Sequence, residues 1–296
     1  MSVSINGVQK RVGIALSGGG FRAAAFHLDV LRKLQKLELL KSVDLLSCVS
    51  GGSIAGALLA LNWNSATVLD DLEPYLRTKS IAVGSCARWD ARPFCQPFGQ
   101  AGQDLRPRPV SWRKSQGTCG RSVNLPELHE SGHRQHVFFV AGGGAPEEMG
   151  EHELRVVPGA EFVLARAVAA SSAFPPLKLE SDEYAPALPV DYVTLTDGGI
   201  YDKLGVNPAL RARNKIDYLF VSDGGKPFAN SANPTEVGSV VLKVALDIMM
   251  EQIRGLEFDR LEHRHKAGVG PKSLWVSIDS SVGGGAGGRC AVCEFH

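Results

Sequence analysis

Apolar runs and glycine turns alternate over the first sixty residues of the chain. A buried-strand pattern covers residues 12–16, and the serine-glycine run at 17–20 interrupts it. Apolar positions then recur every three or four residues across 23–40, which predicts an amphipathic helix. A second buried strand is predicted at 43–49, followed by an alanine- and leucine-rich helix at 52–63. This order of strand, helix, strand and helix predicts a parallel sheet covered by helices.

The rest of the chain continues the α/β pattern after a break. Further strands are predicted at 136–140, 192–196, 218–222 and 274–278, and a long helix at about 236–266. Between residues 86 and 122, seven basic residues, two acidic residues, four prolines and three cysteines occur with few branched aliphatics. Such a composition buries little surface, which predicts a surface loop or insertion. We expect one domain over residues 8–282, with an atypical loop or insertion at about 86–135 and a flexible glycine-rich tail at 283–296.

Composition excludes several classes of protein. Hydrophobic residues make up 44% of the 296 positions and charged residues 21%, which is typical of globular domains. The net charge of +1 gives no electrostatic case for a nucleic-acid partner. The longest apolar run, Ile54–Leu61, is far shorter than a membrane-spanning helix needs. No cleavable signal peptide is evident, so a cytoplasmic location is expected, with export by a route without a cleaved signal left open.

The six cysteines predict neither a disulfide framework nor a metal site. Their positions follow no framework spacing, and three hundred residues can form a core without disulfides. Cys290 and Cys293 form a CxxC pair, but no second pair exists to complete a four-ligand zinc site. We therefore expect no metal and no cofactor.

Ser50 lies between a predicted buried strand and a predicted helix, followed directly by Gly51 and Gly52. A serine on such a turn is typical of a nucleophile elbow, usually written GxSxG, whose small neighbours let a strained turn expose the hydroxyl. Here Cys48 replaces the first glycine. A plain helix-capping turn explains this motif alone equally well.

Gly18, Gly19 and Gly20 also follow a strand and open a helix. Consecutive glycines at a helix start can aim backbone N–H groups at one point, where a phosphate or an oxyanion would be held. Neither the P-loop ending nor the GxGxxG spacing of nucleotide sites is present. The alternative is a tight turn without a ligand.

Asp197 and Asp223 each end a predicted strand and precede two glycines. Groups at the carboxyl ends of strands in open α/β sheets line the ligand crevice, so either aspartate can meet Ser50 there. An Asx turn is the alternative for each, and spacing does not choose between them. Together the three loops supply a nucleophile, a base and oxyanion donors, which acyl transfer needs.

The order of these motifs resembles that of the patatin-like phospholipase family. The matching segments are residues 17–22 (Ser-Gly-Gly-Gly-Phe-Arg), 50–53 (Ser-Gly-Gly-Ser), 170–176 (Ala-Ser-Ser-Ala-Phe-Pro-Pro) and 196–199 (Thr-Asp-Gly-Gly). The resemblance implies a three-layer α/β/α sandwich with a central, mostly parallel sheet. It also implies calcium-independent hydrolysis of lipid acyl esters by a Ser-Asp dyad, without a catalytic histidine.

Carried over by motif, Ser50 is the expected nucleophile and Asp197, rather than Asp223, the general base. The expected oxyanion donors are the amides of Gly18, Gly19, Gly20 and Gly51. We expect Arg22 to orient the glycine loop or to contact a lipid phosphate, with an exposed salt bridge as the alternative. The implied partner is a lipid or another acyl ester, met through transient contact with a membrane surface. The oligomeric state is left open.

Four positions depart from the family pattern, and each predicts a local change. Cys48 replaces the first glycine of the elbow, and Ala23 follows the arginine of the oxyanion motif where a glycine is usual. Asp29 lies in mid-helix where a small residue is expected, and Lys203 stands where relatives often have asparagine.

Two other functions fit the same residues. A Ser-His-Asp esterase would use His263 or His265, which follow Asp197 in the order that such hydrolases require. A catalytically impaired lipid-binding protein would keep the fold without the chemistry, with the basic residues between 88 and 121 attracting anionic headgroups. For this basic stretch a solvated loop is the alternative. His27 is interpreted as a helix-surface or packing residue rather than a catalyst, because nothing in the sequence places it beside Ser50.

Overall fold

The computed structural model of the chain describes most of the predicted elements. It covers residues 3–5, 7–61, 63, 67–70, 72–78, 122–130, 136–142, 148–151, 155–158, 164–173, 179–181, 193–225 and 237–279. Residues 86–121 of the expected insertion and the expected tail at 283–296 lie outside these residues. Among the helices it describes, none has the length and apolarity needed to cross a membrane.

A run of parallel strands forms the half of the main sheet that carries the glycine loops. These strands are, in spatial order, β12 (Lys272–Ser277), β11 (Tyr218–Asp223), β3 (Val12–Leu16), β4 (Val43–Val49) and β5 (Ser122–Glu130). Each pairs in parallel with its neighbour. Because parallel strands end at the same edge, the loops that follow β3, β4 and β11 are brought close together.

Beyond β5 the sheet continues with antiparallel strands. The sequence pattern predicted two of them, at 136–140 and 192–196, but not the other three. This part contains β6 (His136–Gly142), β7 (Glu148–Glu151), β8 (Arg155–Pro158), β9 (Leu179–Ser181) and β10 (Val193–Asp197). Strand β10 pairs antiparallel with β5 and with β9. A separate hairpin joins β1 (Val3–Ile5) to β2 (Val8–Lys10). The described sheet is therefore mixed, with a parallel half around the predicted βαβα unit.

Strand β5 corrects the expected extent of the insertion. Residues 122–130 fall within the segment predicted as a loop at 86–135, yet they pair with β4, β6 and β10. The register of β5 shifts in its pairing with β4 and again in its pairing with β6. Such irregularities, together with a proline and several polar residues, hide the alternation from which a strand is recognised.

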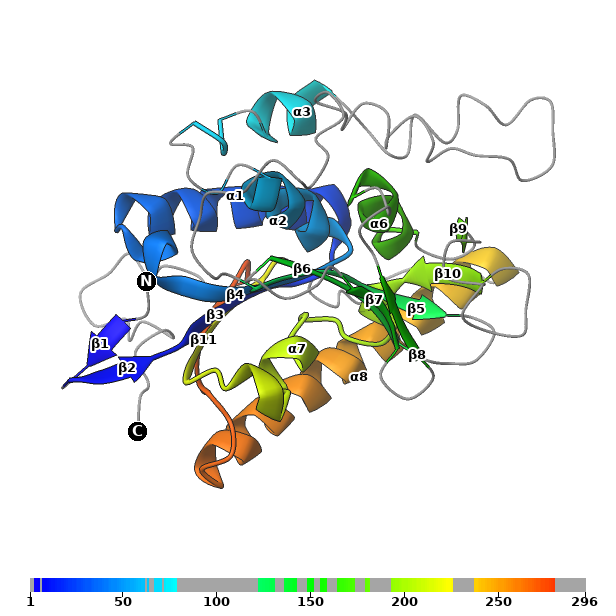
Figure 1. The fold of residues 1–296 in the computed structure, drawn as a ribbon. Helices are drawn as coiled ribbons and strands as arrows, with labels where there is room; N and C mark the ends of the chain where they lie inside the picture. Colours follow the sequence, from blue (N-terminus) through cyan, green and yellow to red (C-terminus); the bar gives the residue numbers. More distant parts are fainter. Residues whose placement is uncertain are drawn as a thin grey trace, which may run out of the picture.

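Helices cover both faces of the sheet and give the three layers that the resemblance implies (Figure 1). One face carries α1 (Gly20–Lys36), α2 (Gly51–Leu61), α3 (Leu72–Thr78) and α6 (Leu164–Ser171). The other carries α7 (Asn207–Leu210) and the long helix α8 (Gly238–Lys266). Short 3-10 turns are η1 (Leu39–Ser42), η4 (Gly198–Ile200) and η5 (Ala212–Asn214). The predicted α/β class is confirmed.

Most predicted elements differ from the observed ones only at their ends, and the first helix shows the clearest difference. It was expected to run to residue 40, but α1 ends at Lys36. Glu38 adopts a left-handed backbone with φ 59°, which breaks the helix before η1 begins. The apolar spacing continues through the break because Leu40 is buried beneath the turn, so periodicity alone does not reveal it.

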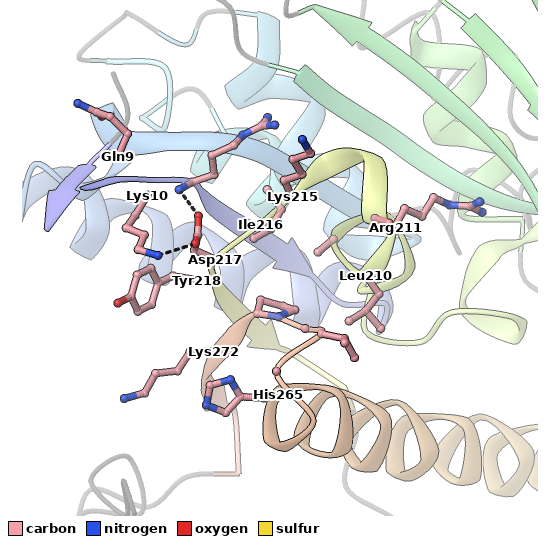
Figure 2. Close-up of a pocket in the computed structure, with 17 residues that line it drawn as sticks. Gln9, Lys10, Leu210, Arg211, Lys215, Ile216, Asp217, Tyr218, His265 and Lys272 are labelled. Atoms are coloured by element: carbon pink, nitrogen blue, oxygen red, sulfur yellow. Dashed lines mark hydrogen bonds and ion pairs between the residues drawn. The ribbon is translucent and has the colours of Figure 1, made fainter. Parts of the chain in front are cut away.

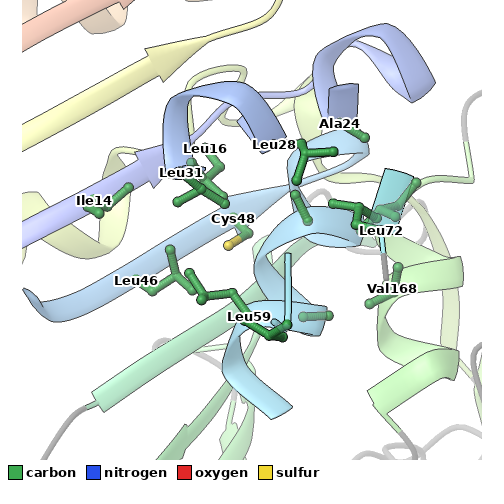
Figure 3. Close-up of a cluster of buried hydrophobic side chains, with 14 of the residues drawn as sticks. Ile14, Leu16, Ala24, Leu28, Leu31, Leu46, Cys48, Leu59, Leu72 and Val168 are labelled. Atoms are coloured by element: carbon green, nitrogen blue, oxygen red, sulfur yellow. The ribbon is translucent and has the colours of Figure 1, made fainter. Parts of the chain in front are cut away.

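The main core lies between the sheet and the layer formed by α1 and α2 (Figure 3). Leu16, Leu31 and Leu46 are each at most 1% exposed, and each such side chain contributes roughly 2 kcal/mol of burial free energy. Cys48 belongs to this core, and its sulfur occupies the place where a β-carbon at Gly56 would lie. The cysteine that departs from the elbow pattern is thus accommodated by a glycine in α2 and does not crowd the turn.

Candidate active site

Ser50 occupies a strained turn between β4 and α2. Its φ of 48° lies in the left-handed region, which is uncommon for a residue other than glycine, and the side chain is 6% exposed. The next two glycines make this turn possible. A β-carbon at Gly51 would overlap the carbonyl oxygen of Gly20, and one at Gly52 would lie 2.5 Å from the carbonyl oxygen of Leu16. This is the geometry that the elbow motif predicts.

The Ser50 hydroxyl donates a hydrogen bond of 2.6 Å to Oδ2 of Asp197. Asp197 ends β10, and its other oxygen accepts the amide of Gly199 at 2.7 Å. This second bond caps η4 and fixes the carboxylate plane. The structure therefore brings together the expected nucleophile and the expected base, which are 147 positions apart in the sequence.

The carboxyl group of Asp197 is only 2% exposed. Burial raises its pKa from 3.8 to about 6, while the hydrogen bonds from Ser50 and Gly199 and the charge of Lys203 oppose this rise. A buried carboxylate without a direct cationic partner is a stronger base than one in water. The raised pKa leaves the group ionised at neutral pH and still able to accept a proton.

Asp223, the other aspartate left open by the motif spacing, has a different environment. Nε of Arg254 donates to its Oδ2 at 2.5 Å, and the amide of Gly225 donates to its Oδ1 at 3.0 Å. Both carboxylate oxygens of Asp223 are therefore engaged by groups other than Ser50. The geometry thus distinguishes the two aspartates, and only Asp197 contacts Ser50.

The glycine loop packs directly against Ser50, but its three amides are not equivalent. The Gly18 amide donates to the carbonyl oxygen of Lys203 at 2.9 Å, so it is already engaged and does not fit its expected role as an oxyanion donor. Gly19 and Gly20 have φ values of 141° and 67°, which favour glycine. Within the described residues, their amides have no hydrogen-bond acceptor.

A buried polar network supports the glycine loop from beneath. Nε2 of His27 contacts the carbonyl oxygen of Ser17 at 3.0 Å, and Nδ1 contacts Oγ of Ser222 at 2.7 Å. A carbonyl oxygen can only accept, so Nε2 carries the hydrogen, and in the neutral ring Nδ1 accepts from the Ser222 hydroxyl. Burial lowers the pKa of His27 to about 4, which keeps the ring neutral. Of the two positions expected for His27, on the helix surface or packed inside, these contacts and its complete burial select the packed one.

Two serines that the sequence analysis quoted without a role hold the elbow in place. Oγ of Ser171 accepts the Ser50 amide at 2.9 Å, and Oγ of Ser172 donates to the Ser50 carbonyl at 3.1 Å. Ala173, which follows them, accepts the Asp197 amide at 3.0 Å through its carbonyl. Residues 171–173, at the end of α6 and in the turn after it, therefore hold both Ser50 and Asp197 in position. Its position in the ordered motifs was the only signal of this role.

The other departures from the family pattern also have structural explanations. Ala23 fits because Gly19 and Gly224 leave room for it, since a β-carbon at Gly19 would lie 3.0 Å from the Ala23 methyl. Arg22 donates to the carbonyl of Gly224 at 3.4 Å, which links the two glycine loops and favours an orienting role. Asp29 is a surface residue, with 82% of its side chain exposed.

Lys203 is 9% exposed and lies close to both aspartate loops. Its side-chain carbons come within 4.0 Å of where β-carbons at Gly199 and Gly225 would lie. Burial lowers the pKa of Lys203, and the charges of Asp197, Asp223 and acidic residues of α8 oppose this. Glu257 of α8 accepts the backbone amides of residues 203 and 204, at 3.1 and 2.9 Å, and so fixes the loop that carries the lysine.

The histidines of the alternative esterase mechanism lie far from Ser50. His263 contacts the carbonyl of Asp259 within α8, and His265 lines a cleft at the opposite edge of the sheet. This placement contradicts their assignment as the base for Ser50. In the part of the chain that the structure describes, no group of three or more His, Cys, Asp or Glu side chains is arranged to hold a metal ion.

Comparisons with solved structures give weak overall likenesses. Human group IVD cytosolic phospholipase A2 is 12% identical, with a TM-score of 0.41, over 73% of this chain and 46% of that one. The same human enzyme with a methyl γ-linolenyl fluorophosphonate inhibitor and terbium chloride is 18% identical, with a TM-score of 0.42, over 73% and 41%. VipD from Legionella pneumophila is 10% identical, with a TM-score of 0.40, over 79% and 52%. The chain thus spans about half the length of these structures.

The family comparison is more specific. None of the curated proteins matches the chain. The model of the family described as patatin-like phospholipase matches residues 14–210, which contain the glycine loop, the elbow, the serine pair of α6 and Asp197. This match covers about two thirds of the sequence, so the predicted resemblance is confirmed and the chain belongs to the patatin-like phospholipase family.

Proposed function

We propose that this protein is a serine lipid acyl hydrolase that works through a Ser50–Asp197 dyad without calcium. The observation that carries the proposal is the direct 2.6 Å hydrogen bond from the Ser50 hydroxyl to the buried Asp197 carboxylate. Membership of the patatin-like phospholipase family supports a lipid substrate. The strained backbone at Ser50 supports a nucleophilic rather than a capping role.

In the first half of the proposed reaction, Oγ of Ser50 attacks the acyl carbonyl carbon while Asp197 accepts the hydroxyl proton. The resulting tetrahedral intermediate carries its negative charge on the former carbonyl oxygen. Asp197 then gives the proton to the leaving alkoxide, the ester C–O bond breaks, and an acyl-enzyme remains. The raised pKa of Asp197, about 6, favours both transfers because the group is neither a very weak base nor a very weak acid.

The proposed oxyanion donors are the amides of Gly19, Gly20 and Gly51. They are supported by the close approach of the glycine loop to the elbow, where a β-carbon at Gly51 would lie 2.7 Å from the nitrogen of Gly20. Amides fixed at that junction would stabilise the developing charge without reorganising during the reaction. Gly18 supports the loop by packing against Ser50, since a β-carbon there would lie 3.3 Å from the Ser50 β-carbon.

In the second half, Asp197 accepts a proton from water, which attacks the acyl carbonyl. The intermediate collapses, Ser50 regains its proton, and the fatty acid leaves. The proposed location is cytoplasmic, with transient contact at a membrane surface from which the lipid is taken. We propose this contact because lipids of the implied class are held in bilayers or micelles.

The test is hydrolysis of p-nitrophenyl esters of graded chain length, and then of phospholipid vesicles, with a calcium chelator present. Ser50→Ala should lower kcat at least about 1,000-fold and Asp197→Asn about 100- to 10,000-fold, because each removes a group that acts on the reacting atoms. Chelator should leave the wild-type rate unchanged. Folding of each variant is checked by circular dichroism and thermal unfolding.

Ser47→Ala is the matched control for Ser50→Ala. Ser47 lies three residues earlier, within β4, is also buried, and its hydroxyl has no hydrogen-bond partner among the described residues. Removing it should leave activity unchanged and preserve or slightly raise stability. A variant at Ser50 or Asp197 that folds and keeps wild-type activity would refute the dyad. A folded wild type that hydrolyses neither substrate would favour the lipid-binding alternative.

A further inference from the structure

A second concave site lies at the opposite edge of the parallel sheet from Ser50. It is a cleft of about 740 Å³, within the size range of small-molecule sites. Residues 9–11 before β3, residues 215–218 at the start of β11, and residues 268–272 before β12 form its walls. Leu210 and Ile216 contribute apolar surface (Figure 2), and Pro271 also belongs to the lining.

Positive charge is concentrated in this cleft. Its lining contains five lysine or arginine side chains, namely Lys10, Arg11, Arg211, Lys215 and Lys272, together with His265. Among the residues that the structure describes, Asp217 is the one acidic residue of the lining, so the described lining has a formal charge of +4 with the histidine neutral. One of the five cations, Arg211, lies over the ring of Phe138, 5.8 Å from its centroid. The whole chain has a net charge of only +1, so the rest of the protein is net negative. This charge is local to a concave surface and does not follow from the overall composition.

The single acidic side chain is already engaged with its neighbours. Oδ1 of Asp217 accepts from Nζ of Lys10 at 2.9 Å, and its Oδ2 accepts the backbone amide of Arg11 at 2.9 Å (Figure 2). It therefore neutralises one lysine of the cleft. Within the described residues, the ion pair of Asp217 is with Lys10, and neither Arg11 nor Lys215 forms one, although the charge of Arg11 also lowers the pKa of Asp217.

The backbone around these cations is fixed without a ligand. The carbonyl of Arg11 accepts the amides of Asp217 and Tyr218 at 2.9 and 3.1 Å, and the carbonyl of Asp217 accepts the Lys272 amide at 2.8 Å. These bonds join the starts of β3, β11 and β12 into one rigid floor. Cations that are fixed before binding lose less entropy when an anion arrives.

We propose that this cleft binds a soluble phosphorylated ligand with two or more phosphate groups. Arginine and lysine side chains that line a concave surface are suited to phosphate, which accepts several charge-assisted hydrogen bonds at once. A single phosphate would neutralise only part of the +4 charge, so a ligand with several phosphates is the better match. The apolar surface would contact the non-phosphate part of such a ligand.

The ligand is distinct from the substrate of Ser50. The path from Arg11 to Ser17 follows the length of β3, which at about 3.3 Å per residue separates the two sites by about 20 Å. The phosphate of a glycerophospholipid lies only a few bonds from its ester, so one lipid cannot reach both sites. Because the sites lie at opposite edges of the sheet, a flat membrane that presents a lipid to Ser50 does not also reach the cleft. This geometry favours a soluble ligand over a lipid headgroup.

The test is calorimetric titration of the full chain with inorganic pyrophosphate at low ionic strength. The variant Arg11→Gln/Lys215→Asn removes two cations whose side chains have no ion pair in the described structure. Asparagine tolerates the left-handed backbone at Lys215, where φ is 46°. We expect wild type to bind pyrophosphate and the double variant to bind at least about tenfold more weakly. Lys36→Gln, an exposed lysine of α1, is the charge control and should bind as wild type does.

Two further arms separate the possible sources of phosphate. Ser50→Ala should bind pyrophosphate as wild type does, which distinguishes the cleft from the proposed catalytic site even if the proposed function fails. Sedimentation with vesicles containing phosphatidylinositol bisphosphate should be equal for wild type and the double variant. Absence of pyrophosphate binding, or equal binding by the double variant, would overturn the proposal. Loss of vesicle binding in the double variant would also overturn it and identify a membrane headgroup as the ligand.

Discussion

Arg254 of α8 holds the carboxylate of Asp223 through a 2.5 Å hydrogen bond from Nε to Oδ2. Asp223 is only 1% exposed, so removal of Arg254 would leave a buried charge with only the Gly225 amide and the nearby Lys203 to compensate it. We therefore expect Arg254→Gln to lower the free energy of unfolding by about 3 kcal/mol, measured by urea denaturation. Lys243→Gln, which breaks the exposed pair with Asp247 in the same helix, should cost less than about 1 kcal/mol. Equal losses of unfolding free energy in both variants would contradict the role of Arg254 as the partner of a buried charge.

The proposed reaction should depend on the ionisation of Asp197. Its carboxylate must be free to accept a proton, and its pKa is about 6, so kcat/KM should rise with pH through about 6 and then level off. The charge of Lys203 lowers this pKa. Lys203→Met should therefore move the acid limb to higher pH, whereas Lys33→Met on the exposed face of α1 should leave it in place. The measurement is a pH–rate profile with a neutral ester. If the acid limb of Lys203→Met lay at the same pH as that of the wild type, the influence of Lys203 on the pKa of Asp197 would be contradicted.

His27 and Asp197 should affect stability in opposite directions as pH falls. The folded-state pKa of His27, about 4, lies below its ordinary 6.5, so the folded protein binds fewer protons and loses stability as pH falls from 6.5 to 4. The pKa of Asp197, about 6, lies above its ordinary 3.8, so the folded protein gains stability as pH falls from 6 to 3.8. Each effect amounts to about 3 kcal/mol over its window, and in the wild type the two largely cancel.

Variants should separate these two effects. On acidification from pH 7 to 5, His27→Gln should gain stability relative to the wild type, and Asp197→Asn should lose it. Chemical denaturation at several pH values measures both slopes. If the two variants showed the same change in slope, the neutral buried state of the His27 ring or the raised pKa of Asp197 would be wrong.

Gly51 should tolerate no side chain. A β-carbon there would overlap the Gly20 carbonyl, so the elbow and the glycine loop would have to separate. Gly51→Ala should lower kcat at least about 100-fold, because both the Ser50 turn and the proposed oxyanion amides would move. Gly255→Ala provides a matched control, since a β-carbon at that position of α8 meets nothing within 4 Å, and helix propensity favours alanine there. Wild-type activity in Gly51→Ala would contradict the close contact.

Strands β3 and β4 of the parallel half were predictable because both are buried on both faces. Residues 12–16 and 43–49 therefore form apolar runs, and their helices have apolar positions at the spacing of one face. Strand β5 was missed for a related reason. It is irregular in register and rich in polar residues, so its place in the sheet depends on partners far away in the chain.

In the candidate site, too, some features could be predicted from the sequence and others could not. Ser50, Asp197 and the glycine loop were recognised because strained turns require glycines at fixed offsets, and these offsets are visible as motifs. The roles of Ser171, Ser172 and Lys203 were not visible, because hydroxyl and ammonium groups give no signal until the fold shows what they contact. The hydrogen bond from the Gly18 amide to the Lys203 carbonyl was not visible in the sequence for the same reason.

The sequence by itself determined the family, the α/β order and the loops in which nucleophile and base would be found. These properties depend on local periodicity and on turn chemistry, which act over a few residues. Only the tertiary structure showed that Asp197 contacts Ser50 directly, which amides remain available, and that basic residues from separate segments line one cleft. Those outcomes depend on distances between segments up to about two hundred residues apart, and such distances are set by the pairing of strands and the packing of helices on them.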